Sequence, residues 1–287
     1  MNKKYNDTQI IELHPQGLTD REIAEILGVT PNNLATKRRQ LGLKPNKSIR
    51  DTYILSDYEL SILVGTLLGD STIRYVHNQC KYPNLTFTHG INQKEYFDWL
   101  TDKLKNLNSS INEYNSAYIR KSGEIAKRWV FTGKNMKCLK EIYEIFYPNN
   151  KKIIPIDYLE NTFTEISLYC LFMDDGSYDI HTNSFIINTQ CFSKDNLLEF
   201  CEFLKKKFNL SFNIKSDNCL YLKHESNEIL KNILSKYNEC STMVYKYDSH
   251  RKTPLNRETP NSNLDNPVLN PQETEENAKR LEVIPNE

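Results

Sequence analysis

Two apolar segments that each end in an acidic residue recur 105 residues apart in the chain. The first begins at Leu63 and reads LVGTLLGDS, and the second begins at Leu168 and reads LYCLFMDDG. Their apolar runs predict two buried helices that carry Asp70 and Asp175 at their C-terminal ends. A unit duplicated within one chain usually packs about a pseudo-twofold axis, as a homodimer joined by a linker would. The chain is therefore expected to form two related halves around this pair of helices.

The segments around each copy also recur in order. Positions 94–104 match positions 194–204 in apolar pattern, at an offset of 100 residues. The predicted fold class is α+β, with two pseudo-symmetric αββαββα repeats, at 57–150 and 151–249, whose strands form a saddle. The expected helices cover 58–68, 93–107, 136–146, 165–173, 194–208 and 228–236, and the expected strands cover 73–76, 84–89, 117–119, 128–132, 184–189, 212–214 and 219–222.

Residues 1–45 predict a separate all-α unit of three short helices. Thr19 and Glu22 form a capping box at the start of the second helix, Gly28 ends it, and Thr30 caps the third. Two helices joined by a short glycine-containing turn make a helix-turn-helix. The alternative is a solvated helix face in a small protein-binding bundle. The outward face of the third helix carries amide and basic side chains, which can bind the base edges and phosphates of DNA. The expected DNA-binding residues are therefore Asn32, Asn33, Thr36, Lys37, Arg38 and Arg39.

The charges of the chain sum to zero but are unevenly spread, with 37 Lys+Arg residues against 37 Asp+Glu residues. Residues 1–50 hold nine basic and five acidic residues, whereas residues 253–287 hold three basic and seven acidic ones. A basic head favours contact with phosphates. Residues 46–56 are expected to be a linker. Residues 250–287 are rich in Pro and Asn and poor in apolar residues, which predicts a disordered tail, an inert extension rather than a binding segment.

The seven cysteines are scattered, with no CxxC pair and no histidine at zinc-finger spacing, so reduced thiols are expected. The sequence contains no apolar run of about 18 residues that could cross a membrane. Its first residues show neither the apolar core of a signal peptide nor a transit-peptide composition. We therefore expect a protein with no membrane partner that stays where it is made, in the cytoplasm.

The two aspartates at the helix ends are the strongest candidates for chemistry. Packing of the two helices along a pseudo-axis would bring Asp70 and Asp175 side by side, where their negative charges repel. A divalent cation removes that cost, and oxygen ligands without nearby Cys or His suit Mg²⁺. The alternative is a pair of solvent-facing carboxylates, but an acid at a helix C-terminus is unfavourable for the helix dipole. Two such acids at equivalent places therefore predict metal ligation.

The pattern resembles the LAGLIDADG homing endonucleases that carry two motifs in one chain. The resemblance covers roughly residues 55–248 and includes KKIIP from Lys151, INTQCFS from Ile187 and MVYK from Met243. It implies metal binding by the eighth motif residue of each copy, and the chain departs from the usual motif at Ser71 and Asp174. Gln190 lies on the strand after the second motif, where the family often places a polar group that orients metal-bound water. No glutamine in the first half mirrors it, because the offset of 100 residues leads to Gly90, and His89 beside that glycine is expected to be structural. The resemblance implies a catalytic set made of Asp70, Asp175, Lys152, Lys246 and Gln190, with the two aspartates as metal ligands.

The same resemblance implies what the protein does. It predicts a monomeric, site-specific homing endonuclease that hydrolyses double-stranded DNA with Mg²⁺ (or Mn²⁺) and leaves a staggered double-strand break with 3′ overhangs. The helix-turn-helix would extend the DNA footprint. Two alternatives remain open at this point, an intron RNA maturase and a non-cleaving DNA-binding regulator on the same fold. Retention of both Asp70 and Asp175 favours the nuclease over the regulator.

Overall fold

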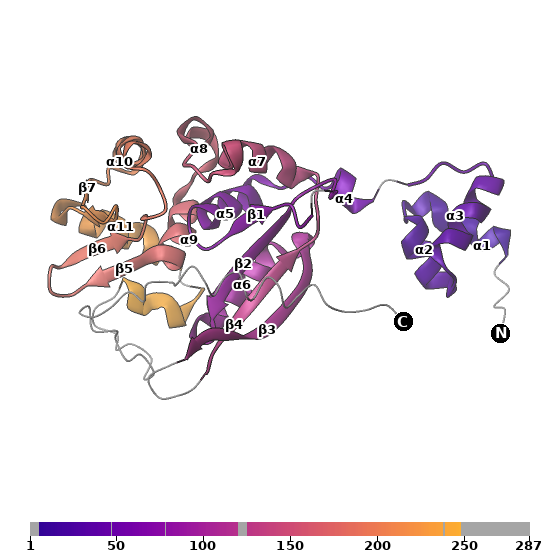
Figure 1. Ribbon diagram of the computed structural model, residues 1–287, viewed down its shortest axis with the longest axis horizontal. Coiled ribbons are helices and arrows are strands. Elements are labelled where there is room, and N and C mark those ends of the chain that lie inside the picture. The colour runs from indigo at the N-terminus through magenta and orange to yellow at the C-terminus, as the bar shows by residue number, and fades with distance from the viewer. Residues whose placement is uncertain (1–5, 47, 78, 120–124, 238, 248–287) are drawn as a thin grey trace, which may run out of the picture. The chain divides into compact units, whose positions relative to one another are not determined.

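The computed structural model shows an all-α N-terminal unit and an α+β body (Figure 1). It describes residues 6–46, 48–77, 79–119, 125–237 and 239–247. The predicted disordered tail at 250–287 lies outside these residues. Within them, no helix is long and apolar enough to cross a membrane.

The N-terminal unit contains the three expected helices, α1 (Asp7–Leu13), α2 (Asp20–Leu27) and α3 (Pro31–Gln40). Thr19 caps α2 and forms the expected capping box with Glu22, so local hydrogen bonds start the helix where the sequence indicated. Gly28 ends α2 with a φ of 65°, a left-handed conformation that glycine adopts without strain. A small core holds the helices together and consists of Ile10, Ile23, Ala24 and Leu34.

The body contains two four-stranded antiparallel sheets, which confirms the duplicated α+β architecture. The first sheet has the order β1-β2-β4-β3 and the second has the order β5-β6-β8-β7. The two orders correspond strand for strand, as expected for a duplication. The strands are β1 (Thr72–Arg74), β2 (Asn84–Gly90), β3 (Asn108–Ile119), β4 (Ile125–Gly133), β5 (Gly176–Asp179), β6 (Ser184–Ile187), β7 (Phe212–Ile214) and β8 (Leu220–Leu222).

The elements of the body follow the predicted order with three additions. The short helices α4 and α8 and the strand β5 had no prediction, because all three are short and their sequences lack a clear apolar period. Helix α4 lies in the segment that was expected to be a linker. The helices are α4 (Ile49–Thr52), α5 (Asp57–Leu68), α6 (Lys94–Lys103), α7 (Cys138–Phe146), α8 (Ile156–Thr162), α9 (Glu165–Asp175), α10 (Lys194–Phe208) and α11 (Asn227–Ser235), with a 3₁₀ turn at Ser241–Lys246.

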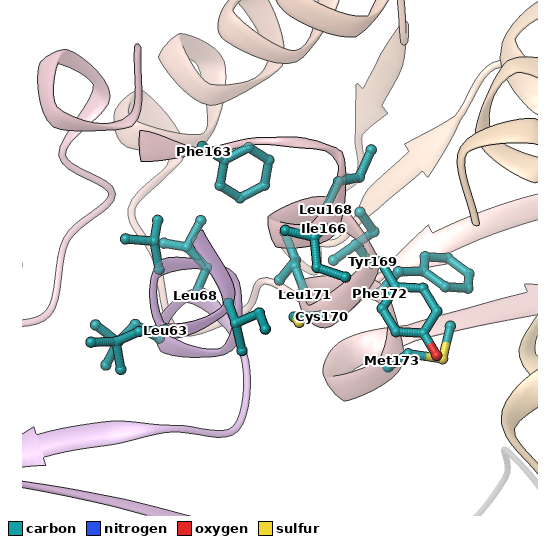
Figure 2. Packing of buried hydrophobic residues seen from close by; sticks show 14 of the residues in the cluster. Leu63, Leu68, Phe163, Ile166, Leu168, Tyr169, Cys170, Leu171, Phe172 and Met173 are labelled. Carbon is teal, nitrogen blue, oxygen red and sulfur yellow. The ribbon is translucent and has the colours of Figure 1, made fainter. Parts of the chain in front are cut away.

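Helices α5 and α9 pack against each other between the two sheets (Figure 1). A Cβ atom placed on Gly65 would lie 2.3 Å from the carbonyl oxygen of Ser167, so only glycine permits this approach. The Ser167 hydroxyl donates a hydrogen bond of 2.6 Å to the Ser61 carbonyl across the same interface. Figure 2 shows the buried side chains of α9 beside those of α5. The two halves therefore share one apolar core, and the C-terminal ends of both helices point to one place.

The two halves differ in the length of their outer hairpins. Strands β3 and β4 have 12 and 9 residues, whereas β7 and β8 have 3 residues each. The prediction of a three-residue strand at 117–119 was too short. Ladder bonds between Asn108 and Ile119 of β3 and their partners on β4 extend that strand, and such pairing is not visible in local sequence.

Candidate active site

Asp70 and Asp175 lie at the ends of α5 and α9 and influence each other electrostatically. The pKa of Asp175 is raised to about 7, first by burial and then by the negative charges of Asp70 and Asp174. The pKa of Asp70 is raised to about 6, first by burial and then by Asp174. The structure therefore brings the two predicted metal ligands into one site, where their charges are costly to hold without a cation.

A third carboxylate, Asp174, lies at the same place and is fully buried. Its Oδ2 atom accepts hydrogen bonds from the Thr66 hydroxyl at 2.7 Å and from the Asp70 backbone N–H at 3.1 Å. Burial raises its pKa to about 6. A Cβ atom on Gly69 would lie 2.5 Å from the Asp174 Cβ, so the glycine of the first motif makes room for the unusual acid of the second. The side chain crosses the interface between the two helices.

His89 on β2 faces the acids from the first sheet. Its Nδ1 atom lies 3.5 Å from Asp70 Oδ2, and its Nε2 atom lies 3.8 Å from Asp174 Oδ1. Burial lowers the pKa of this histidine to about 4. His89 was expected to be structural, and it was not placed in the site. Two features of the sequence could have indicated this position. His89 lies beside the counterpart of Gln190, and the alternation of buried and less buried residues along β2 turns its side chain inward.

The two predicted lysines each reach the C-terminal end of one motif helix. Lys152 donates to the carbonyls of Gly69 at 3.3 Å and Ser71 at 3.2 Å. Lys246, which is buried, donates to the carbonyls of Met173 and Asp174, the latter at 2.9 Å. Burial lowers the pKa of Lys152. Both ammonium groups thus occupy the negative ends of the helix dipoles, and their charges oppose the rise in the aspartate pKa values.

Gln190 lies in an exposed turn after β6, and the prediction that it sits on a strand was wrong. Strand β6 ends at Ile187 because it pairs with only short partners. Asn188 reaches the motif end instead. Its backbone N–H and its side-chain Nδ2 both donate to the Asp175 carbonyl, at 3.0 and 2.9 Å. Sequence reasoning missed Asn188, two residues before the residue it selected.

On the N-terminal unit, Arg38, which was predicted to bind DNA, does not lie on the outward face of α3. It is 6% exposed, and its guanidinium donates to Asp20 Oδ1 and to the Leu43 carbonyl, both at 2.7 Å. A buried guanidinium needs such partners, and they hold α3 to α2. Lys37 is half-buried and forms an ion pair with Asp7 at 3.1 Å. The exposed residues among those predicted are Asn32, Asn33, Thr36 and Arg39.

Comparison with known proteins agrees with this geometry. The model of the LAGLIDADG DNA endonuclease family matches residues 60–245, which include both motifs and both sheets. The chain belongs to this family. The match begins after the helix-turn-helix, so the N-terminal unit is an addition to the LAGLIDADG body.

Two relatives and one solved structure resemble the chain over different lengths. A "Probable intron-encoded endonuclease 1" of Wickerhamomyces canadensis is 28% identical over 224 residues, which are 71% of this chain and 92% of that protein. The structure of the homing endonuclease I-WcaI bound to its DNA recognition sequence is 25% identical, with a TM-score of 0.62, and the match covers 78% of this chain and 96% of that chain. Protein RecA of Mycobacterium gastri is 27% identical over 144 residues, which are 48% of this chain but only 30% of that protein.

Proposed function

We propose that the protein is a site-specific homing endonuclease that makes a metal-dependent staggered break in double-stranded DNA. The observation that carries the proposal is the convergence of Asp70 and Asp175 at the ends of two packed helices, inside a LAGLIDADG body. The similar structure of I-WcaI is described as bound to its DNA recognition sequence, and it covers 78% of this chain. Double-stranded DNA is therefore the proposed substrate.

The side chains at the motif ends fit a divalent cation. Asp70 and Asp175 supply carboxylate oxygens, the ligands that Mg²⁺ prefers, and their raised pKa values show how unfavourable their charges are without one. We assign these two residues as ligands for Mg²⁺ or Mn²⁺. A bound divalent ion in such a site activates water and stabilises the leaving oxygen of a phosphodiester.

The remaining residues of the site act on the substrate through charge. Lys152 and Lys246 place positive charge beside the two aspartates, where the negative charge of the reacting phosphate increases. Asn188 holds the Asp175 carbonyl and so positions that motif end. Gln190 lies in a turn rather than on the strand. For Gln190 to orient metal-bound water, as proposed, this turn would have to move when DNA binds.

The architecture suits cleavage of both strands by one chain. Two motif ends, one from each half, supply one centre per strand, so we propose that a monomer suffices. The strands of the two sheets would read the major groove. The exposed residues of α3 (Asn32, Asn33, Thr36 and Arg39) would add contacts outside the body.

A cleavage assay tests the proposal. The substrate is a plasmid in which the two DNA segments that flank the gene are joined directly, so that it represents the site before insertion of the gene. The assay compares cleavage in Mg²⁺ with cleavage in a chelator. The wild type is expected to linearise the plasmid only with Mg²⁺. Asp70→Asn is expected to lower the rate by about 10³-fold or more while DNA binding survives, because the positioning of a metal ligand is lost.

The matched control is Asp98→Asn, which removes an exposed acid on α6 outside the site. It should cut at the wild-type rate. Cutting by Asp70→Asn at the wild-type rate, or no Mg²⁺-dependent cutting by the wild type on this substrate, would refute the assignment.

A further inference from the structure

A compact group of side chains that can bind a metal lies at the end of the first motif. It consists of Asp70, His89 and Asp174, and two of these residues do not belong to the symmetric pair of Asp70 and Asp175. Each residue offers one ligand atom, and the three atoms all lie within 4.8 Å of one another. The side chains of His89 and Asp174 are fully buried, whereas the side chain of Asp70 is 37% exposed. The group therefore has two inner ligands and one that opens toward the solvent.

Three polar atoms of this group are buried without a hydrogen-bond partner among the described residues. They are Nδ1 and Nε2 of His89 and Oδ1 of Asp174. Burying such atoms unpaired is unfavourable, because they lose the hydrogen bonds that water provides in the unfolded chain. The His89 ring cannot turn away easily, since the Tyr96 ring packs edge-on against it at a centroid distance of 5.1 Å. The fold thus keeps the imidazole between the two carboxylates, and the ring nitrogen that carries the lone pair would bind the ion.

Among the described residues, such a group occurs at one motif end only. The counterpart of Asp174 in the first motif is Gly69, which has no side chain. The counterpart of His89 in the second half is Thr189, which follows β6 and whose hydroxyl donates a hydrogen bond of 2.6 Å to the Asn218 carbonyl. The group adds a histidine and the seventh motif residue to Asp70, so it breaks the symmetry of the Asp70 and Asp175 pair.

We propose that Asp70, His89 and Asp174 bind one first-row transition-metal ion, such as Mn²⁺, Co²⁺ or Zn²⁺. Mg²⁺ favours all-oxygen sites, whereas an imidazole nitrogen beside two carboxylates suits these ions better. Ligands about 2.1 Å from an ion lie at most about 4.2 Å apart, so contraction by tenths of an ångström would close the group. The exposed side of Asp70 offers a path of entry.

The ion would share Asp70 with the catalytic pair and couple the two sites through that carboxylate. Binding at this group does not require cleavage or DNA, so it can be tested on the full-length protein alone. Failure of the endonuclease proposal would appear as absent cutting, whereas failure of this inference would appear as absent nitrogen coordination.

Pulsed electron paramagnetic resonance of the Mn²⁺-loaded protein measures that coordination directly. The wild type is expected to show spin-echo modulation from a ¹⁴N nucleus, and labelling its histidines with ¹⁵N should convert the pattern to that of ¹⁵N without any mutation. His89→Phe should lose the modulation and weaken Mn²⁺ binding by about tenfold or more. Asp174→Ala should also lose it, whereas Asp175→Asn should keep it.

His181→Phe is the matched control, because it removes an exposed histidine outside the group. It should retain the modulation, and excess Mg²⁺ should not abolish it. Wild-type Mn²⁺ protein without histidine modulation would overturn the inference. Modulation that persists in a folded His89→Phe variant would also overturn it. So would loss of the modulation when excess Mg²⁺ is added, because an all-oxygen site would lose its Mn²⁺ in the same way.

Discussion

At the scale of single residues, the site is dominated by three carboxylates and two lysines at the ends of two helices. The pKa values of Asp70 and Asp174 are raised to about 6, and the pKa of Asp175 is raised to about 7. Burial is the first cause in each case, and repulsion between the acids adds to it for Asp70 and Asp175. Together they make stability depend on both pH and metal.

The stability of the metal-free protein should therefore fall as pH rises from about 4 to about 7. The ordinary pKa of an aspartate is 3.8, so in this window the folded chain holds protons that the unfolded chain has released. Mg²⁺ should raise the melting temperature by several degrees at pH 8, about 2 kcal/mol, and have little effect at pH 5. Thermal melts at the two pH values check this, and an equal Mg²⁺ effect at both would contradict it.

Two neighbouring arginines on α3 should behave differently. Arg38→Ala should destabilise the helix-turn-helix by about 1.5–3 kcal/mol, because it removes the bonds to Asp20 and Leu43. Arg39→Ala should leave the melt of the isolated unit unchanged but weaken DNA binding and reduce its salt dependence by about one counterion. Thermal melts and fluorescence anisotropy at two salt concentrations separate these effects. The reverse pattern would show that Arg39, and not Arg38, is structural.

At the scale of elements, the contact between α5 and α9 decides where the motif ends meet. Gly65 lies against the backbone of Ser167, which cannot move away, whereas Gly69 lies against the side chain of Asp174. The two glycines are therefore required for different reasons. Lys152 and Lys246 complete the arrangement by binding the last carbonyls of each helix.

Gly69→Ala should destabilise the protein, and it should cost less in an Asp174→Gly background. The added Cβ would lie 2.5 Å from the Asp174 Cβ, so the clash disappears only when residue 174 has no Cβ. A double-mutant cycle of urea unfolding should show a coupling of about 1–3 kcal/mol. Gly65→Ala is the contrasting variant, because its added Cβ meets the backbone of Ser167 and should not be rescued by Asp174→Gly. Strict additivity of Gly69→Ala and Asp174→Gly would mean that the two side chains do not compete for this space.

At the scale of the whole chain, a LAGLIDADG body is joined to an N-terminal helix-turn-helix that has its own core. The two cores are separate sets of buried residues. The first half of the body also has the longer outer hairpin, of 12 and 9 residues. Recognition of DNA is therefore expected to be unequal along the target.

Removal of residues 1–45 should leave site-specific cleavage intact but weaken binding. The body retains both motif ends, so the site of cutting should not change, while loss of the α3 contacts should lower affinity and the salt dependence of binding. Cleavage mapping and binding isotherms at several salt concentrations on the two chains check this. A truncated chain that binds as tightly as the full chain would show that the unit does not contact the target.

The elements that depend on neighbours in the chain could be predicted from the sequence. The capping box of Thr19 and Glu22 starts α2, and the duplicated apolar runs form α5 and α9 with an acid at each end. Local hydrogen bonds and apolar periodicity act over a few residues, so they can be read directly. The resemblance of the two motifs to a known family supplied Lys152 and Lys246.

Which polar side chains meet could not be predicted in this way, because it depends on long-range packing. Asp174 bonds to the Asp70 backbone from 104 residues away, and His89 reaches both acids from another element. Arg38 lies on a polar helix face yet is buried by Asp20, 18 residues earlier. Such contacts depend on how closely helices and sheets approach, which glycine positions and strand pairing set together. No local sequence pattern contains this information, so the group of Asp70, His89 and Asp174 could be found only in the folded structure.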